Sequence, residues 1–329
     1  MTSAARQVFK GGLAAFEQAT QETAVIASSS GGAILRRGLA VAIFSLLEEF
    51  LLSRLNEIAV VINQGHLHFS NLPSAMQSRA IKNVIEVANA RLSRGGPLVD
   101  TSLAQSVGAS LTAINGPIIL SPLTWAWKGS NLNEQDYFGI LKSFHLQNAA
   151  AEVQDLAGRL GFNVTSPTGT PLDARDQLKQ FASERHAAAH DAQHSVSTLW
   201  LNGVLDLAIK YAVCFDAFVS TAAGAMRAGD ANFLNNPGWS KSANVSIRKI
   251  VERTKDWAEF REGATKAAHV SADRASLTLA ASGRCGPTEL LVVSSKAGRI
   301  LDWSVPKSEL EPRGRDRSQQ TSFRPSGLS

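Results

Sequence analysis

The sequence predicts a mainly α-helical protein with a small α+β module near its C-terminus. Residues 33–62 and 195–226 carry apolar residues at three- and four-residue spacing, which is typical of long helices in a bundle. Residues 275–305 contain short apolar runs separated by turn residues, which is typical of a small antiparallel sheet. The 329 residues, 44% of them hydrophobic, suffice for one large domain with a full core and a second, smaller one.

The N-terminal half is expected to form three helical segments. Residues 4–26 have a helical pattern with a flaw at Gly11-Gly12, residues 33–62 form one long helix, and residues 75–92 form another. The apolar stripe of the first segment is predicted to consist of Val8, Leu13, Phe16 and Ala19.

The pattern is less regular between residues 102 and 170. Short helices are predicted over 102–114, 133–146 and 149–161, and residues 163–173 form a turn-rich linker. A helix then begins after Asp173, a favourable N-cap residue, and leads into the long last helix of the bundle.

These patterns divide the chain into a helical domain over 1–235, with its irregular middle region 102–170, and a small module over 240–306. The module is predicted to contain one charged helix, over 246–264, and about three strands, over 275–282, 289–295 and 299–305. Residues 307–329 have no apolar period, so we expect a disordered tail.

The composition favours a protein of the cytoplasm with a polyanionic partner. The net charge of +5 and the pI of about 9.4 suit RNA or DNA, although solubility alone explains them equally well. The only cysteines, Cys214 and Cys285, imply no disulfide framework. No signal peptide or membrane-spanning segment is predicted, so we expect no membrane association.

The most distinctive segment is SERHAAAHDAQH, residues 183–194, which holds three of the seven histidines. His186, His190 and His194 are four residues apart and would lie on one side of a continuous helix, where neutral imidazoles can bind zinc or nickel. No glutamate completes an HExxH pattern, however, and a third ligand eight residues on spans too wide an arc. We therefore predict no metal and no other cofactor.

Arg185 and His190 form a second pattern, an arginine followed by a histidine after four residues. The pattern is short enough to arise by chance, so its context carries the argument. Arg185 continues the apolar stripe of Leu178 and Phe181, and a charge at that position needs a partner, an anion or a subunit interface.

This arrangement resembles the HEPN domains, in particular the RiboL-PSP type found in prokaryotic toxin and defence proteins. The resemblance covers about residues 5–225. The family's helix has the form Leu-x-x-Leu-x-x-x-Arg-polar-x-x-x-His-Gly. Here its positions are occupied by Leu178, Phe181, Arg185, His186 and His190, and Asp191 stands where a glycine is common.

The resemblance implies a metal-independent endoribonuclease of the toxin or anti-phage defence type, with Arg185 and His190 as catalytic residues. A histidine has an ordinary pKa of about 6.5 and can move a proton at neutral pH, while an arginine stabilises phosphate charge. The family also implies RNA as substrate, a homodimer with both Arg/His sets in one cleft, and an antitoxin or defence-system partner protein.

Several alternatives stay open. His186 and His194 are auxiliary candidates for phosphate binding, although a solvated helix face explains them more simply. Glu48 or Glu49 is a candidate to face the cleft. The chain could also be a catalytically inactive HEPN-like protein that binds RNA or a nucleotide or serves as a scaffold, or a metal-binding helical protein.

Overall fold

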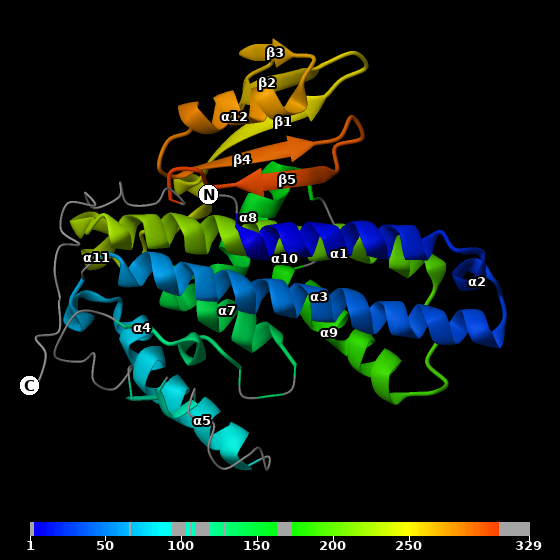
Figure 1. Ribbon diagram of the computed structural model, residues 1–329, viewed down its shortest axis with the longest axis horizontal. Helices are drawn as coiled ribbons and strands as arrows, with labels where there is room; N and C mark the ends of the chain where they lie inside the picture. Colours follow the sequence, from blue (N-terminus) through cyan, green and yellow to red (C-terminus); the bar gives the residue numbers. More distant parts are fainter. Residues whose placement is uncertain are drawn as a thin grey trace, which may run out of the picture.

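Three long helices run side by side through the centre of the molecule: α1 (Ala4–Thr20), α3 (Ser30–Asn63) and α10 (Thr198–Arg227) (Figure 1). The computed structural model describes residues 3–65, 67–93, 103–105, 107–108, 119–127, 129, 131–162 and 173–308. Within these residues, the predicted mainly helical bundle with a small α+β module is confirmed.

Shorter helices cover the central ones, and most of the predicted segments are found. The helices are α2 (Thr23–Ile26), α4 (Ser74–Ser78), α5 (Val84–Ser93), α7 (Glu134–Ser143), α8 (Ala149–Leu160), α9 (Ala174–His190) and α11 (Ala231–Asn235). Single turns form η1 (Phe69–Asn71), η2 (Arg79–Asn83), η4 (Pro122–Thr124) and η5 (Ser242–Asn244). The helix predicted over 102–114 lies mostly outside the described residues, as does nearly all of the linker at 163–173.

The stripe predicted for α1 is wrong at Val8, whose side chain is 59% exposed. The buried residue is Phe9, which contacts the ring of Phe50 on α3 with centroids 4.8 Å apart. Leu13 and Phe16 are buried as predicted. Because Phe9 also contacts Trp303 of the C-terminal sheet, α1 is covered on two sides, by α3 and by the sheet.

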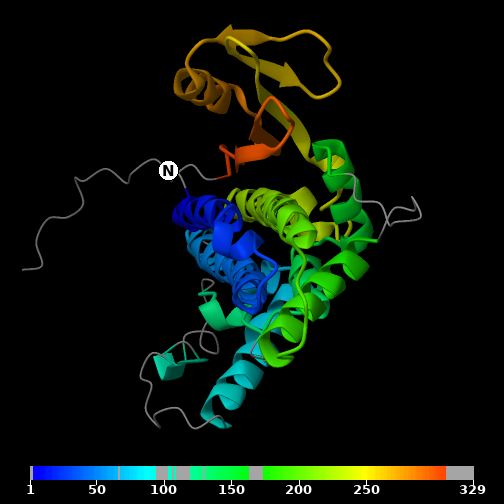
Figure 2. The same ribbon diagram turned by 90° about the vertical axis from the view of Figure 1, so that its right-hand side faces the viewer.

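The C-terminal sheet has five strands in the order β3-β2-β1-β4-β5. They are β1 (Ser246–Glu252), β2 (Trp257–Arg261), β3 (His269–Ser271), β4 (Glu289–Ser294) and β5 (Ile300–Ser304). The helix α12 (Arg274–Arg284) packs on the outer face, and the bundle covers the inner face (Figures 1 and 2). β1 and β4 are parallel and the other pairings are antiparallel, so the sheet is mixed rather than purely antiparallel.

Two assignments within this module were wrong. Residues 246–264, predicted as a charged helix, form the β1–β2 hairpin, and residues 275–282, predicted as a strand, lie in α12. The first prediction assumed that the charged residues are exposed on a helix. Arg248 is instead buried in a strand, where it pairs with Glu259 and Glu289. The second prediction did not take Asp273 into account as an N-cap. Its carboxylate caps α12 by accepting hydrogen bonds from Ala275 N and Ser276 N.

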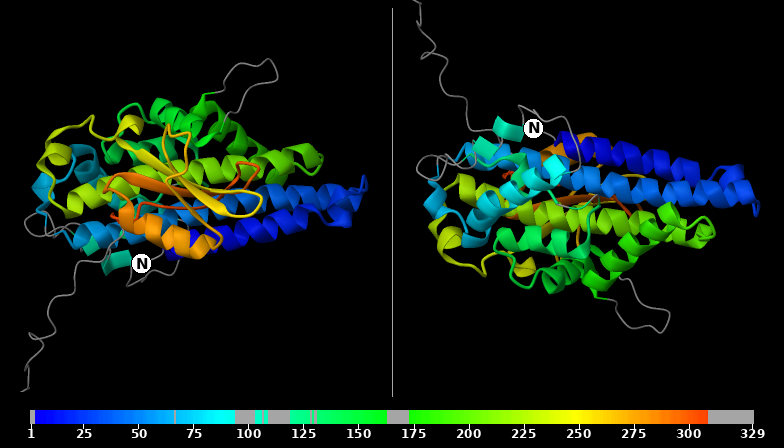
Figure 3. Two further views of the ribbon diagram at one scale, coloured as in Figure 1. Left: turned by 90° about the horizontal axis from the view of Figure 1, so that it is seen from above. Right: turned by 90° about the horizontal axis from the view of Figure 1, so that it is seen from below.

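The sheet and the bundle share one hydrophobic core. Figure 3 shows the sheet lying over the long helices when the molecule is seen from above. At its centre the carboxylate of Asp216, on α10, accepts hydrogen bonds from Arg54 Nε (2.6 Å) and Trp303 Nε1 (2.8 Å) and lies 3.2 Å from Arg6 Nε. The two arginines outweigh the effect of burial and lower the pKa of Asp216 to about 2. This buried network therefore joins α1, α3 and α10 to β5.

The chain after β5 continues to pack on the bundle. Ser308 is buried and lies against Gly224, and the carbonyl of Lys307 accepts a hydrogen bond from Arg227. The predicted disordered tail over 307–329 was therefore placed two residues too early, and its remainder, 309–329, lies outside the described residues. None of the described helices has a stretch long and apolar enough to cross a bilayer.

Candidate functional site

The helix α9 carries the Arg/His pattern and forms where the sequence predicts it. Asp173 caps its first turn by accepting a hydrogen bond from Arg175 N (2.6 Å). Leu178 and Phe181 are buried, and the Phe181 ring meets Phe44 of α3 edge-on with centroids 4.9 Å apart.

This packing changes the interpretation of the apolar stripe on α9. A subunit interface on this stripe is one of the explanations that the sequence allows for the charge of Arg185. The stripe is available for such a contact only if it is exposed. It is covered within the chain instead, because Phe44 and Trp200 both contact Phe181. The stripe is therefore no evidence for a subunit contact through α9.

A tight turn follows α9 and is held by α3. Asp191 accepts a hydrogen bond from Gln193 N (2.8 Å) through its side chain, and α10 begins after the N-cap Ser197. Arg36 Nε donates to the carbonyl of Val196 (2.8 Å), and Arg37 donates to the carbonyl of Ala192. The turn is therefore fixed relative to α3 by two arginines.

Asp191 occupies the position at which the HEPN pattern usually has glycine. Its backbone is extended, with φ −106° and ψ 108°. A residue with a side chain adopts this conformation without strain, since only the left-handed region favours glycine. The departure from the family pattern is therefore compatible with the turn.

Arg185 lies half-buried between α9 and α3, close to Glu48. Its Nε is buried, and no acceptor among the described residues lies within hydrogen-bonding reach of that atom. Burial raises the pKa of Glu48, while a hydrogen bond from Leu132 N and the positive charge of Arg185 act in the opposite direction. Of the two glutamates singled out in the sequence, Glu48 faces this region and Glu49 is exposed.

His186 and His190 form a pair of exposed rings one turn apart on α9. Their centroids are 4.6 Å apart and their planes are inclined by 50°. His190 is the last residue of the helix and is open to solvent. A substrate can therefore reach both imidazoles.

Arg185 and His190 do not lie on the same face of α9. Five residues correspond to about 140° around a helix axis and about 7.5 Å along it. Arg185 accordingly faces α3, while His190 projects from the exposed end of the helix. A single substrate that touches both must extend around the last turn of α9.

His194 is separated from the other two histidines, because α9 ends at His190. Its Nε2 lies 2.8 Å from the carboxylate of Glu184, and both side chains are about three-quarters buried. The continuous face that would place three histidines in register is therefore absent. Within the described part of the chain, no group of three histidine, cysteine, aspartate or glutamate residues is arranged to hold a metal ion.

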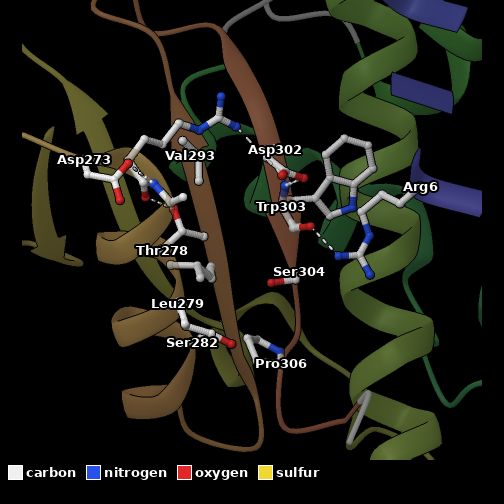
Figure 4. A pocket seen from close by; sticks show the side chains of 13 residues that line it. Arg6, Asp273, Thr278, Leu279, Ser282, Val293, Asp302, Trp303, Ser304 and Pro306 are labelled. Carbon is white, nitrogen blue, oxygen red and sulfur yellow. Dashed lines mark hydrogen bonds and ion pairs between the residues drawn. The ribbon is translucent and has the colours of Figure 1, made fainter. Parts of the chain in front are cut away.

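A large pocket lies elsewhere, between α12 and β5 (Figure 4). It has a volume of about 720 Å³, and Arg274 and Asp302 approach each other to 3.9 Å beside it. Leu279 forms part of its rim and is 77% exposed. No histidine or cysteine lines it, and its carboxylates are those of Asp273 and Asp302.

Sequence reasoning missed Glu184, the partner of His194, and Arg37, which holds the turn. Both contacts depend on how the chain reverses after α9, and no spacing pattern predicts that geometry. The pocket was also missed, because its wall α12 was predicted to be a strand.

No family model, curated protein or solved structure matches this chain. The resemblance to HEPN domains therefore depends on the residues of α9 and on the order of the helices.

Proposed function

We propose that this chain is a metal-independent endoribonuclease of the toxin or anti-phage defence type, acting through Arg185 and His190. The observation that supports this most is the state of these two side chains. His190 is open to solvent at the end of α9, and Arg185, in the same helix, has a buried Nε with no acceptor among the residues that the structure describes.

The proposed reaction needs no group beyond the chain and the RNA. His190 accepts the proton of the ribose 2′-hydroxyl, the 2′ oxygen bonds to phosphorus, and the bond from phosphorus to the 5′ oxygen breaks. The departing oxygen takes up a proton, which the neighbouring His186 can supply. The products are a 2′,3′-cyclic phosphate and a 5′-hydroxyl.

Arg185 would stabilise the negative charge that develops on the phosphate oxygens. In the free protein its charge faces Glu48. Glu48 is thus a positioning residue in this proposal, since its carboxyl group accepts a hydrogen bond from Leu132 N and lies close to the charge of Arg185. His194 is turned toward Glu184 and would contribute to phosphate binding only if that contact broke.

A second candidate function is RNA or nucleotide binding without catalysis. It is favoured by one observation, the separation of Arg185 and His190 around the axis of α9. If no second copy or conformational change brings them to one phosphate, the arginine binds and the histidine does not react.

The experiment uses the purified full-length protein and a fluorescently labelled single-stranded RNA, with and without EDTA. We expect the wild type to cleave in EDTA and to leave cyclic-phosphate ends. His190→Ala and Arg185→Ala should each lower the cleavage rate by a factor of about 10² to 10⁴. Circular dichroism should show that both variants remain folded, because neither side chain belongs to the hydrophobic core.

The matched control is His269→Ala, which removes another exposed histidine, on β3. It should cleave at the wild-type rate. Cleavage by His190→Ala at a rate close to the wild type would show that the site is wrong, and loss of cleavage in EDTA would indicate a metal-dependent reaction. A wild type that binds RNA without cutting it, with binding lost in Arg185→Ala, would establish the second candidate.

A further inference from the structure

The inner face of the C-terminal sheet is apolar except at one end. β1 and β4 are parallel and run side by side toward the same end of the sheet (Figure 1). At their beginning, Ile247 and Leu290 belong to the core that the sheet shares with the bundle. Toward their carboxyl ends the same face carries Lys249 and Ser294, because side chains alternate between the two faces of a strand. This end of the inner face therefore differs chemically from the core beside it.

A pocket of about 470 Å³ opens at this end, between the sheet and the helices α8 and α10. Its volume lies in the range of sites for small organic ligands. Leu160 and Phe162, at the end of α8 and just after it, give the pocket apolar walls together with Ile300 of β5. None of the described residues that line the pocket comes from α9, so the pocket is separate from the candidate site around Arg185 and His190.

Lys249 brings a positive charge onto this half-buried face. Its Nζ donates a hydrogen bond to the carbonyl of Arg159, in the last turn of α8 (2.9 Å). This acceptor is neutral and engages one of the three protons of the ammonium group. The remaining protons are available to a ligand in the pocket that Lys249 lines.

Glu262 does not neutralise Lys249. Arg159 holds the carboxylate of Glu262 through Nε (2.7 Å) and Nη2 (2.6 Å). These hydrogen bonds lower the pKa of Glu262, and the charge of Lys249 adds a smaller effect in the same direction. No carboxylate of the described residues lies within ion-pair distance of Lys249 Nζ. A half-buried ammonium group in these surroundings is stabilised by an anion.

Ser294 supplies a second unused polar group. Its side chain is 8% exposed and lines the pocket. Its hydroxyl forms no hydrogen bond with another residue of the described part of the chain. A hydroxyl buried to this degree normally has a partner, and a ligand in the pocket can provide one.

Two further cations lie on the turn between β4 and β5. Lys296 Nζ donates to Thr254 Oγ1 (3.2 Å), which is again a neutral partner. Arg299 pairs with Glu17, and its Nε lies 3.9 Å from Asp206. Among the described residues that line the pocket, Asp206 is the only carboxylate, against three cations. The lining therefore carries more positive than negative charge.

We propose that this pocket binds a small organic phosphate. Lys249, Lys296 and Ser294 hold the phosphate, and Phe162 and Ile300 contact the carbon skeleton. Hydrogen bonds from an ammonium group to a phosphate are roughly twice as strong as neutral ones. A phosphate dianion also matches the excess of positive charge better than a carboxylate does. The walls on the sheet side and the α8 side suit a molecule of limited size rather than a polymer.

The site lies outside the part of the chain that resembles the HEPN domains. The resemblance covers about residues 5–225, whereas Lys249, Ser294 and Lys296 belong to the C-terminal module. The inference therefore goes beyond the proposed nuclease function. Binding is measured without RNA and cleavage is measured without the phosphate ligand, so either proposal can fail alone.

The first test is isothermal titration calorimetry of the full chain with phenyl phosphate, whose ring represents the carbon skeleton. Inorganic phosphate and phenyltrimethylammonium are the comparison ligands. We expect phenyl phosphate to bind, inorganic phosphate to bind more weakly, and the cation not to bind. Absence of binding at about 10 mM phenyl phosphate, or equal affinity for the two phosphates, would overturn the inference.

The second test uses variants of the lysines. Lys249→Gln removes the charge but keeps a donor for the carbonyl of Arg159, and Lys296→Ser changes an exposed turn. Each should weaken the binding of phenyl phosphate about tenfold or more, while the melting temperature stays nearly unchanged. Lys266→Ser is the matched control, because Lys266 is exposed and does not line the pocket. If Lys249 serves only to cap α8, Lys249→Gln binds like the wild type, and the proposal is wrong.

Hydrogen–deuterium exchange then locates the ligand. Bound phenyl phosphate should slow exchange over residues 294–300, which form one wall of the pocket, and leave α12 unchanged. A single-stranded RNA should not displace the ligand. Protection confined to other segments, or displacement by the RNA, would assign the binding to a different surface and overturn the proposal.

Discussion

Glu48 is a residue at which burial and a neighbouring charge have opposing effects. Its carboxylate is half-buried between α3, the backbone of Leu132 and Arg185. Burial dominates and raises its pKa, so ionisation of Glu48 costs stability in the folded chain. A half-buried carboxyl group next to an arginine fits a role in positioning that arginine.

We therefore expect Glu48→Gln to separate stability from activity. Below about pH 4 the wild-type side chain is neutral and the two proteins should be equally stable. As the pH rises through the raised pKa, the wild type loses stability that the variant keeps, so the variant should melt at the higher temperature at pH 7. Thermal melts across this range measure the difference.

The nuclease proposal adds an expectation for the same variant. Cleavage by Glu48→Gln should be slower than by the wild type, although the fold is no less stable. Glu49→Gln, on the exposed side of the same helix, is the control and should change neither quantity. Equal cleavage by Glu48→Gln and the wild type would argue against the positioning role.

At the scale of the element, the beginning of α3 depends on a glycine. Gly32 is buried in the first turn, where a Cβ would overlap the carbonyl oxygen of Ala27 and lie 2.9 Å from that of Ala24. Both atoms belong to the backbone and cannot rotate away. The close contact of α2 with α3 therefore requires a residue without a side chain at position 32.

Gly32→Ala should accordingly lower the free energy of unfolding by about 1 to 3 kcal/mol, the usual cost of overpacking. Gly203→Ala, inside α10 with no atom of the described residues within 4 Å of its Cβ, should instead raise it by up to about 1 kcal/mol, because alanine favours the helix. Urea denaturation of the two variants checks the opposite signs. Stabilisation by both would show that the start of α3 can relax.

At the scale of the whole molecule, Asp216 holds the bundle and the sheet together. It is fully buried and pairs with Arg6, Arg54 and Trp303, which come from α1, α3 and β5. Removing one partner from a buried ion pair leaves charge without compensation. The bundle and the sheet should therefore unfold together in one transition, seen alike by circular dichroism and tryptophan fluorescence.

Asp216→Asn should destabilise the chain by about 3 to 5 kcal/mol. The effect should depend on pH. The pKa of Asp216 is lowered to about 2, so its contribution is present above the ordinary aspartate value of about 4 and is lost as the pH falls toward 2. Asp206→Asn, 61% exposed on the same helix, is the control and should have little effect. A similar destabilisation by both variants would contradict the network's role.

The sequence by itself determined the helical class, the extents of α3, α9 and α10, the N-cap Asp173 and the strands β4 and β5. These features follow from local periodicity and capping, which act within a few residues. The hairpin β1–β2 was decided by tertiary structure, because Arg248 is tolerated in a strand only between Glu259 and Glu289. The helix α12 carries a local signal, its N-cap Asp273, which the sequence analysis overlooked. The proximity of Glu48 to Arg185 was also decided by tertiary structure, since the two residues are more than a hundred positions apart in the chain. The coverage of the α9 stripe depends on which helices pack together, and no pattern within one helix specifies its neighbours.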